Sequence, residues 1–173
     1  MNIFAPIARF LSPRAPAAPG AGCGCAEKAV DTFRGGINCT QAVLAACGTA
    51  HGIEREDAMR LGGAFGSGMN MGETCGAVTG ALMVLGLRHA KVTGAGFLTR
   101  DRTAAATLAF VERFKERNGS VSCKELLGCD LGTPEGRAAA RRDGSFKKRC
   151  PKFVRDAAEI LDEMERARPG ETR

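Results

Sequence analysis

The pattern of apolar positions along the chain is typical of helices, and no segment shows the strict alternation expected of a strand. Near the C-terminus, Val154, Ala157, Leu161 and Met164 recur at intervals of three and four, as residues on one face of a helix do. Helices are predicted at 26–33, 39–50, 54–61, 74–90, 99–118 and 150–167, with a short turn at 123–127. Asn38 is predicted to be the N-cap of the helix that starts at Cys39. We therefore expect an all-α fold, a compact bundle of about five to six helices with a glycine-rich loop.

Length and composition indicate one domain with flexible ends. The 173 residues are 44% hydrophobic, which is enough to build one core. We expect a Pro/Ala-rich flexible tail at 1–22, a single helical cysteine-rich domain at 23–168 and a C-terminal tail at 169–173. Within the domain, the segment 128–149 is expected to be irregular or partly helical.

Two apolar stretches of the chain are candidate signals for export or membrane insertion, and neither has the expected pattern. Pro6 and Arg9 interrupt the apolar run near the start, so we interpret that run as part of the tail and not as a signal. The apolar stretch 75–87 is too short to span a bilayer. We therefore expect a cytoplasmic protein without a membrane span.

Much of the net charge of +6 comes from one basic stretch. Between 137 and 149 the charged residues are Asp143 and six cations: Arg137, Arg141, Arg142, Lys147, Lys148 and Arg149. Such a stretch forms either a solvated loop or a docking surface for an acidic partner or an anionic ligand. Only Phe146 interrupts it, so it offers no aromatic platform for nucleic acid. We expect a redox partner protein, acidic in character, and the sequence leaves a homodimer open.

The segment 62–73 is too rich in glycine for a stable helix. Glycine at this density lets the backbone adopt positive φ or pass close to another group. The segment is therefore either a tight turn between helices or a loop around a site. Glu73 is also placed to cap the next helix or to transfer a proton. The candidate cofactor-binding residues of this region are Gly66, Gly68, Gly72, Glu73 and Gly76.

Four of the eight cysteines stand at predicted helix starts: Cys39, Cys75, Cys123 and Cys150. The first turn of a helix carries unpaired N–H groups and the positive end of the helix dipole, and both stabilise an anion. At such positions the pKa of a thiol can fall to roughly 3.5–7.5. The cations 147–149, directly before Cys150, are expected to act in the same direction. We therefore expect reactive thiolates, and we take these four residues as the candidate catalytic and metal-binding site.

Three kinds of chemistry remain open if the four thiols meet. They could hold an iron–sulfur cluster or another metal for electron transfer or redox sensing. They could form dithiol/disulfide pairs of a metal-free thiol–disulfide oxidoreductase. They could also carry zinc or copper in a non-catalytic binding module. The spacing does not choose among these, and four buried apolar cysteines without chemistry would give the same pattern.

The other four cysteines give weaker signals. Cys47 lies in an apolar run and is expected in the core. Cys129 lies close to Cys123 along the chain and is a candidate auxiliary ligand or resolving thiol. Cys23 and Cys25 border the tail, where they could bind a metal or exchange disulfides.

Several segments together resemble the C_GCAxxG_C_C family of redox-active proteins, which has four characteristic cysteines and a Cys-Gly-Ala-x-x-Gly motif. The matching segments are 36–43, 66–73, the motif Cys-Gly-Ala-Val-Thr-Gly-Ala-Leu at 75–82, 123–128 and Cys150-Pro151. The resemblance implies redox activity at the four cysteines named above. This chain departs from the family pattern by additional cysteines and by a longer basic insert before Cys150, which bears on the choice of partner.

A more distant similarity to the cluster-bearing part of split-Soret cytochromes favours an iron–sulfur site over other thiolate-bound metals. The chain has no Cys-x-x-Cys-His haem attachment and no Walker loop. We therefore expect neither haem nor nucleotide as a cofactor.

Overall fold

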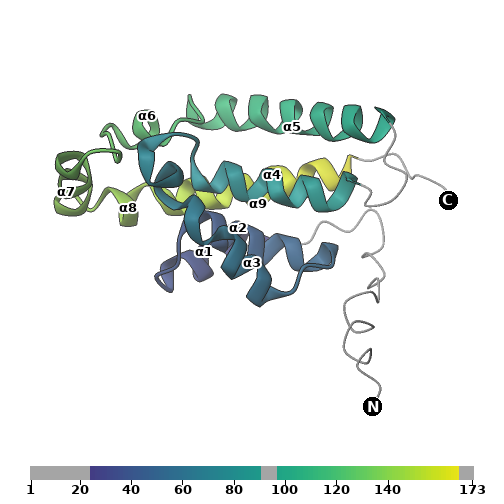
Figure 1. The fold of residues 1–173 in the computed structure, drawn as a ribbon, viewed down its shortest axis with the longest axis horizontal. Coiled ribbons are helices and arrows are strands. Elements are labelled where there is room, and N and C mark those ends of the chain that lie inside the picture. Colours follow the sequence, from purple (N-terminus) through teal and green to yellow (C-terminus); the bar gives the residue numbers. More distant parts are fainter. Residues whose placement is uncertain (1–23, 91–96, 168–173) are drawn as a thin grey trace, which may run out of the picture.

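The computed structural model describes residues 24–90 and 97–167, which fold as packed helices (Figure 1). Within these ranges the β-structure is one isolated antiparallel bridge between Thr74 and Ser122. The all-α prediction is therefore confirmed. No helix in the same ranges has both the length and the hydropathy needed to cross a membrane. The predicted tails at 1–22 and 169–173, together with Cys23, lie outside the described residues.

The long helices form three layers (Figure 1). One layer is α5 (Phe97–Asn118), the middle layer is α4 (Gly76–His89) with α9 (Cys150–Arg166), and the third is α1 (Cys25–Arg34), α2 (Cys39–Cys47) and α3 (Arg55–Leu61). α9 packs against α1, α2, α4 and α5. Its predicted apolar face is confirmed, since Val154, Ala157 and Leu161 are fully buried. The core therefore lies around α4 and α9.

Short helices gather at one end of these layers, on the left in Figure 1: α6 (Cys123–Leu127), α7 (Pro134–Arg142) and α8 (Ser145–Lys148). The segment 128–149, expected to be irregular or partly helical, thus contains two of them. The start of α7 follows from its sequence, because Thr133 Oγ1 accepts a hydrogen bond from Gly136 N at 3.0 Å and Pro134 occupies the first helical position. This end of the molecule carries the candidate site described below.

Glycines on α4 allow α2 and α4 to approach closely. A Cβ atom on Gly80 would lie 2.8 Å from the Thr40 carbonyl oxygen, and one on Gly76 would lie 2.7 Å from Thr40 Oγ1. Thr40 Oγ1 also lies within hydrogen-bond distance, 3.1 Å, of Thr79 Oγ1. Because Cys39 directly precedes Thr40, this close packing sets the first turn of α4 against the first turn of α2.

A disulfide bond between Cys25 and Cys47 joins the start of α1 to the end of α2. Cys47 is in the core, as expected, and its sulfur is bonded to that of Cys25. Both residues are buried, with exposed fractions of 0% and 3%. The bond therefore holds the two helices together at the ends opposite the turn that leads from α1 to Cys39.

Replacing Cys25 and Cys47 together with alanine should lower the free energy of unfolding by about 3 kcal/mol, because the bond restricts a loop of roughly two dozen residues in the unfolded chain. Urea denaturation of the double variant measures the change. The control is Cys129→Ser, which alters a half-buried thiol outside this bond and should cost less than about 1 kcal/mol. Equal midpoints for the double variant and the wild-type protein would show that the bond contributes nothing.

Candidate functional site

A cavity of about 160 Å³, at the end of the molecule where the short helices gather, is lined by Cys39, Cys75, Cys123 and Cys150. These residues are far apart in the sequence, and each is buried, with exposed fractions of 3% to 8%. The remaining lining residues are Asn38, Ser67 and the apolar Phe33, Leu126, Leu127, Phe146 and Phe153. The structure therefore brings the four thiols around one largely apolar space.

Each of these cysteines stands where a helix begins. Cys39, Cys123 and Cys150 are the first residues of α2, α6 and α9, and Cys75 is the N-cap of α4. The starts of α2, α4, α6 and α9 therefore meet at the cavity.

Asn38 fixes the position of the first of these helix starts. Its Oδ1 accepts a hydrogen bond from Gln41 N at 3.0 Å, and its own N–H donates to Gln41 Oε1 at 3.1 Å, which is a complete capping box. Its Nδ2 donates to the carbonyl oxygens of Gly62 and Gly63, both at 3.1 Å. The cap thus ties α2 to the segment that follows α3.

The bridge between Thr74 and Ser122 holds two of the cysteines beside each other. Cys75 N donates to the Val121 carbonyl oxygen at 2.8 Å, and Cys123 N donates to the Glu73 carbonyl oxygen at 2.6 Å. The main chain of each cysteine is thus bonded to the segment that leads into the other. This pairing explains how α4 and α6 both begin at the cavity.

The glycine-rich segment contains a run of left-handed residues. Ser67, Gly68, Met69 and Asn70 have φ of 54°, 61°, 59° and 58°. A left-handed conformation costs a non-glycine residue roughly 1–2 kcal/mol, so the surrounding contacts must stabilise this run. The run includes the start of η4 (Gly68–Gly72) and closes through a hydrogen bond from Glu73 N to the Gly68 carbonyl oxygen at 3.1 Å. The backbone N–H of Ser67 lowers the pKa of the Cys39 thiol, against the larger effect of burial.

The five candidate cofactor-binding positions divide into two groups. Gly66, Gly68 and Gly76 each lie against a residue of the cavity wall: a Cβ atom there would be 2.6 Å from Asn38 Cβ, 2.9 Å from Cys123 Cβ and 2.9 Å from Cys39 Sγ, respectively. The other two face elsewhere. A Cβ on Gly72 would lie 3.0 Å from Asp130 Oδ1, and Glu73 is exposed and 3.8 Å from Lys124 Nζ.

The expectation of low thiol pKa values is not met. Burial raises the pKa of Cys39, although four backbone N–H groups act in the opposite direction: those of Ser67, Cys39, Thr40 and Gly76. Burial also raises the pKa of Cys75 well above its usual range, and nearby Cys39 adds to this effect. The free-energy cost of removing a thiolate from water therefore exceeds the stabilisation that the N–H groups at these helix starts provide.

The same balance holds for the other two site thiols. Burial raises the pKa of Cys123 to about 12, with smaller contributions from Cys39 and Cys129. The pKa of Cys150 is raised by burial first and then by Cys39, Cys123 and Cys129. The cations expected to oppose this point elsewhere, since Lys147 and Lys148 are exposed and Arg149 Nη1 donates to the Leu127 carbonyl oxygen at 3.1 Å. Burial thus favours the neutral thiol form at all four positions.

The four thiols surround a space and do not converge on a point. Over the described ranges, no set of three or more His, Cys, Asp or Glu side chains is close enough to hold a single metal ion. All four site cysteines are free, as is Cys129. A tetrahedral ion with metal–sulfur bonds of about 2.3 Å would need the sulfurs within about 4 Å of one another. What the structure gives is a set of four soft sulfur donors around one cavity of about 160 Å³.

Sequence reasoning found the four cysteines and the Asn38 cap but missed other parts of the site. Ser67 carried no signal beyond its place in the glycine-rich segment, and its left-handed backbone is unusual for a residue with a side chain. Phe33, Phe146 and Phe153 gave no indication that they would line one cavity. These contacts depend on how the helices pack, which local patterns do not specify.

One protein-family model matches the chain, over residues 37–164, and it is described as "Putative redox-active protein (C_GCAxxG_C_C)". The matched region contains all four cysteines of the cavity and excludes Cys25. Comparison with curated proteins and with solved structures gave no match.

Proposed function

Because this chain belongs to the C_GCAxxG_C_C family of redox-active proteins, we propose that Cys39, Cys75, Cys123 and Cys150 hold an iron–sulfur cluster for electron transfer or redox sensing. The observation that carries this proposal is the arrangement of the four buried thiols around one cavity of about 160 Å³. When bound, such a cluster accepts and releases single electrons at this position.

The electrostatics of the site support a cationic occupant. Four buried thiolates would repel one another, which is why Cys39 raises the pKa of each of the other three after burial has done so. Bound metal deprotonates coordinating thiols outright, because its positive charge offsets that repulsion. The backbone N–H groups that lower the pKa of Cys39 stabilise negative charge on its sulfur, which is the form that binds metal.

Those N–H groups also give the chain a means of tuning the site. Hydrogen bonds to sulfur are among the features that set the potential of an iron–sulfur centre. The N–H groups of Ser67 and Gly76 reach Cys39 Sγ from two different elements, so the glycine-rich loop and the start of α4 both stabilise negative charge there. The site is thus asymmetric, because more backbone N–H groups stabilise a negative charge on the Cys39 sulfur than on any of the other three sulfurs.

A metal-free thiol–disulfide oxidoreductase is the second candidate. It is favoured by the finding that all four site cysteines are free and influence each other electrostatically. Burial argues against it, since the thiolate is the attacking form and the pKa values of all four are raised. A zinc or copper module is a weaker candidate, because the described thiols do not converge on one ion.

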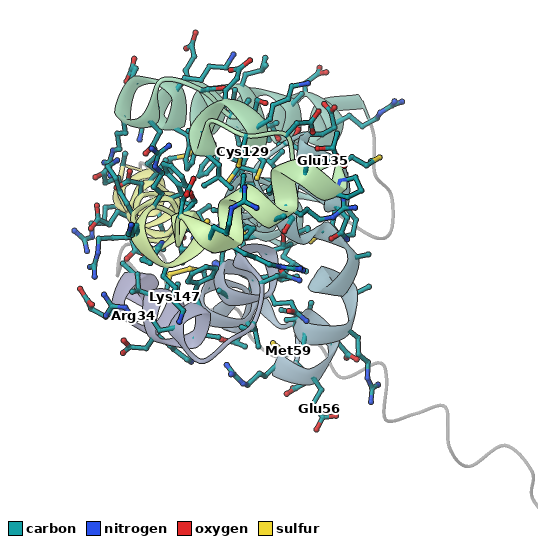
Figure 2. The ribbon with its side chains drawn as sticks, turned by 90° about the vertical axis from the view of Figure 1, so that its left-hand side faces the viewer. Arg34, Glu56, Met59, Cys129, Glu135 and Lys147 are labelled. Carbon is teal, nitrogen blue, oxygen red and sulfur yellow. A yellow bond between two sulfur atoms is a disulfide. The ribbon has the colours of Figure 1, made fainter. Side chains whose placement is uncertain are left out.

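The surroundings of the cavity suit an acidic redox partner. Phe33 and Phe146 line the cavity, and the residue after each, Arg34 and Lys147, is an exposed cation. Figure 2 shows Arg34 and Lys147 on the same face of the molecule. Opposite charge speeds the encounter between electron-transfer proteins, so an acidic surface would be steered to this side.

We place this function in the cytoplasm. Free thiols and their metal complexes persist in a reducing compartment, which matches the five unbonded cysteines among the described residues. The Cys25–Cys47 bond is compatible with that setting because both sulfurs are buried away from dissolved reductants.

The test is to purify the protein without oxygen and to reconstitute it with iron and sulfide. We expect visible absorption that bleaches on reduction, together with stoichiometric iron and acid-labile sulfide. Serine substitution of any one of the four site cysteines should lower the bound iron severalfold, whereas Cys129→Ser should keep it, since Cys129 lies outside the cavity wall. A colourless wild-type protein that binds no iron would refute the proposal, and thiol counting after mild oxidation would then test the second candidate.

A further inference from the structure

The end of α6 folds Cys129 back toward Cys123. The helix has five residues, Cys123–Leu127, and Gly128 follows in the left-handed conformation with φ of 70°. The N–H groups of Gly128 and Cys129 both donate to the Lys124 carbonyl oxygen, the second at 3.2 Å. In this type of helix ending, the second residue after the helix packs against residues of the helix's own first or second turn. In so short a helix that neighbourhood includes Cys123.

The electrostatics place Cys129 beside the site independently of this argument. Cys129 is one of the groups that raise the pKa of Cys123 and of Cys150, after burial and Cys39. Cys129 also packs against the buried core. A fifth thiol therefore adjoins the cavity without lining it.

Cys129 differs from the four site thiols in its accessibility. They are at most 8% exposed, whereas Cys129 is half-buried. Figure 2 shows Cys129 on the face of the molecule where α6 and α7 lie. Thiol–disulfide exchange requires access of the reagent to the sulfur. Among the described free cysteines, Cys129 is therefore the one that a dissolved disulfide reaches first.

We propose that Cys129 is the entry thiol of a relay that passes oxidation from a low-molecular-weight disulfide to Cys123 in the metal-free protein. The partner is Cys123 rather than Cys150 because the closed end of α6 holds Cys129 and Cys123 within one short element.

The relay consists of two exchange steps. The Cys129 thiolate attacks the dissolved disulfide, which forms a mixed disulfide and releases one thiol. The Cys123 thiol then attacks the Cys129 sulfur while its proton passes to the departing sulfur, which forms the Cys123–Cys129 bond and releases the second thiol. The two cysteines are oxidised by two electrons, and one disulfide molecule is reduced to two thiols.

This chemistry gives the site a reversible off state. A sulfur bonded to Cys129 cannot ligate metal, so the oxidised protein would lack one of its four ligands until a reductant restored Cys123. That consequence rests on the proposed cluster. The relay itself concerns the metal-free thiols and holds whether or not a cluster binds.

The experiment incubates full-length, metal-free, reduced protein with oxidised glutathione, blocks the remaining thiols at intervals and maps tryptic peptides by mass spectrometry. Trypsin cuts after Lys124, so Cys123 and Cys129 fall on separate peptides and their bond appears as a linked pair. We expect glutathione on Cys129 first, followed by the linked peptides 118–124 and 125–137.

Two variants test the order of the steps. In Cys123→Ser, the mixed disulfide at Cys129 should accumulate because its resolving thiol is missing. In Cys129→Ser, oxidation of Cys123 should slow by roughly tenfold or more, because the buried sulfur must then react with the reagent directly. Cys150→Ser is the matched control and should leave the Cys123–Cys129 bond and its rate unchanged.

The relay is wrong if glutathione remains on Cys129 of the wild-type protein, if the linked peptide is instead that of Cys150, or if Cys129→Ser is oxidised at the wild-type rate. None of these readouts uses bound iron. A protein that forms the Cys123–Cys129 bond but takes up no iron would refute the cluster and support the relay. A protein that takes up iron but forms no such bond would support the cluster and refute the relay.

Discussion

Replacing Gly76 with alanine should lower the free energy of unfolding by about 3 kcal/mol and prevent iron loading, because the new Cβ would enter a space that is already filled. It would lie 2.7 Å from Thr40 Oγ1 and 2.9 Å from Cys39 Sγ, with the Phe65 carbonyl oxygen at 3.2 Å. Thr40 is fully buried and cannot move aside cheaply. Either α4 withdraws from α2 or Cys39 Sγ leaves its N–H donors, and both outcomes disrupt the cavity. Thermal or urea denaturation and iron analysis measure the two effects.

The same helix offers a matched control. A Cβ on Gly86 meets nothing within 4 Å, so Gly86→Ala should raise stability by about 0.5–1 kcal/mol through the lower entropy of the unfolded chain. The two alanine variants of α4 should therefore differ by about 4 kcal/mol, with iron binding lost only at position 76. If Gly76→Ala were as stable as Gly86→Ala and still took up iron, the close packing of α2 on α4 would not govern the site.

Replacing Arg88 with methionine should lower the free energy of unfolding by about 3–5 kcal/mol, because it removes the cation of a buried ion pair. The Arg88 side chain is 2% exposed, and its Nε lies 3.2 Å from a Glu165 carboxylate oxygen. Nε also donates to His51 Nε2, and Nη1 donates to the Leu161 carbonyl oxygen, both at 2.9 Å. The guanidinium therefore connects the end of α4 with α9 and with η2 (Gly48–His51). Urea denaturation at pH 7 gives the change directly.

An exposed arginine provides the comparison. Arg60 contacts Glu56 at 3.8 Å and Asp57 at 3.9 Å with 77% of its side chain exposed, so Arg60→Met should change stability by less than about 0.5 kcal/mol. The Arg88 variant should leave iron uptake largely intact wherever the protein remains folded, because Arg88 lies outside the cavity wall. If Arg88→Met lowered the free energy of unfolding no more than Arg60→Met does, the attraction within the buried pair would only balance the cost of removing its charges from water.

Local features of the chain predicted the parts of the site that depend on neighbours in sequence. Asn38 was readable as an N-cap because its side chain needs only Gln41, three residues on, to complete the capping box. The apolar face of α9 was readable because helical periodicity brings Val154, Ala157 and Leu161 to one side whatever they pack against. The start of α7 carried an equally clear signal in Thr133-Pro134, which the irregular composition of its surroundings obscured.

The sign of the thiol pKa shifts shows where local reasoning ends. A helix start lowers the pKa of a cysteine, and that effect is visible in the N–H groups around Cys39. Burial opposes it, and burial depends on the side chains that α1, α6, α8 and α9 bring to the same cavity. Sequence alone contains the first effect and not the second, so it predicted thiolates where the folded protein has thiols.

From its sequence alone, this protein is an all-helical chain with four cysteines at helix starts, since helix periods and caps are encoded over a few neighbouring residues. The tertiary structure decided which sulfurs meet. It paired Cys25 with Cys47, set Cys129 beside the site, and made Ser67 left-handed so that its N–H reaches Cys39. Local sequence patterns do not encode these contacts, because they depend on how α1 packs on α2, how α2 packs on α4 and how the Thr74–Ser122 bridge places the starts of α4 and α6.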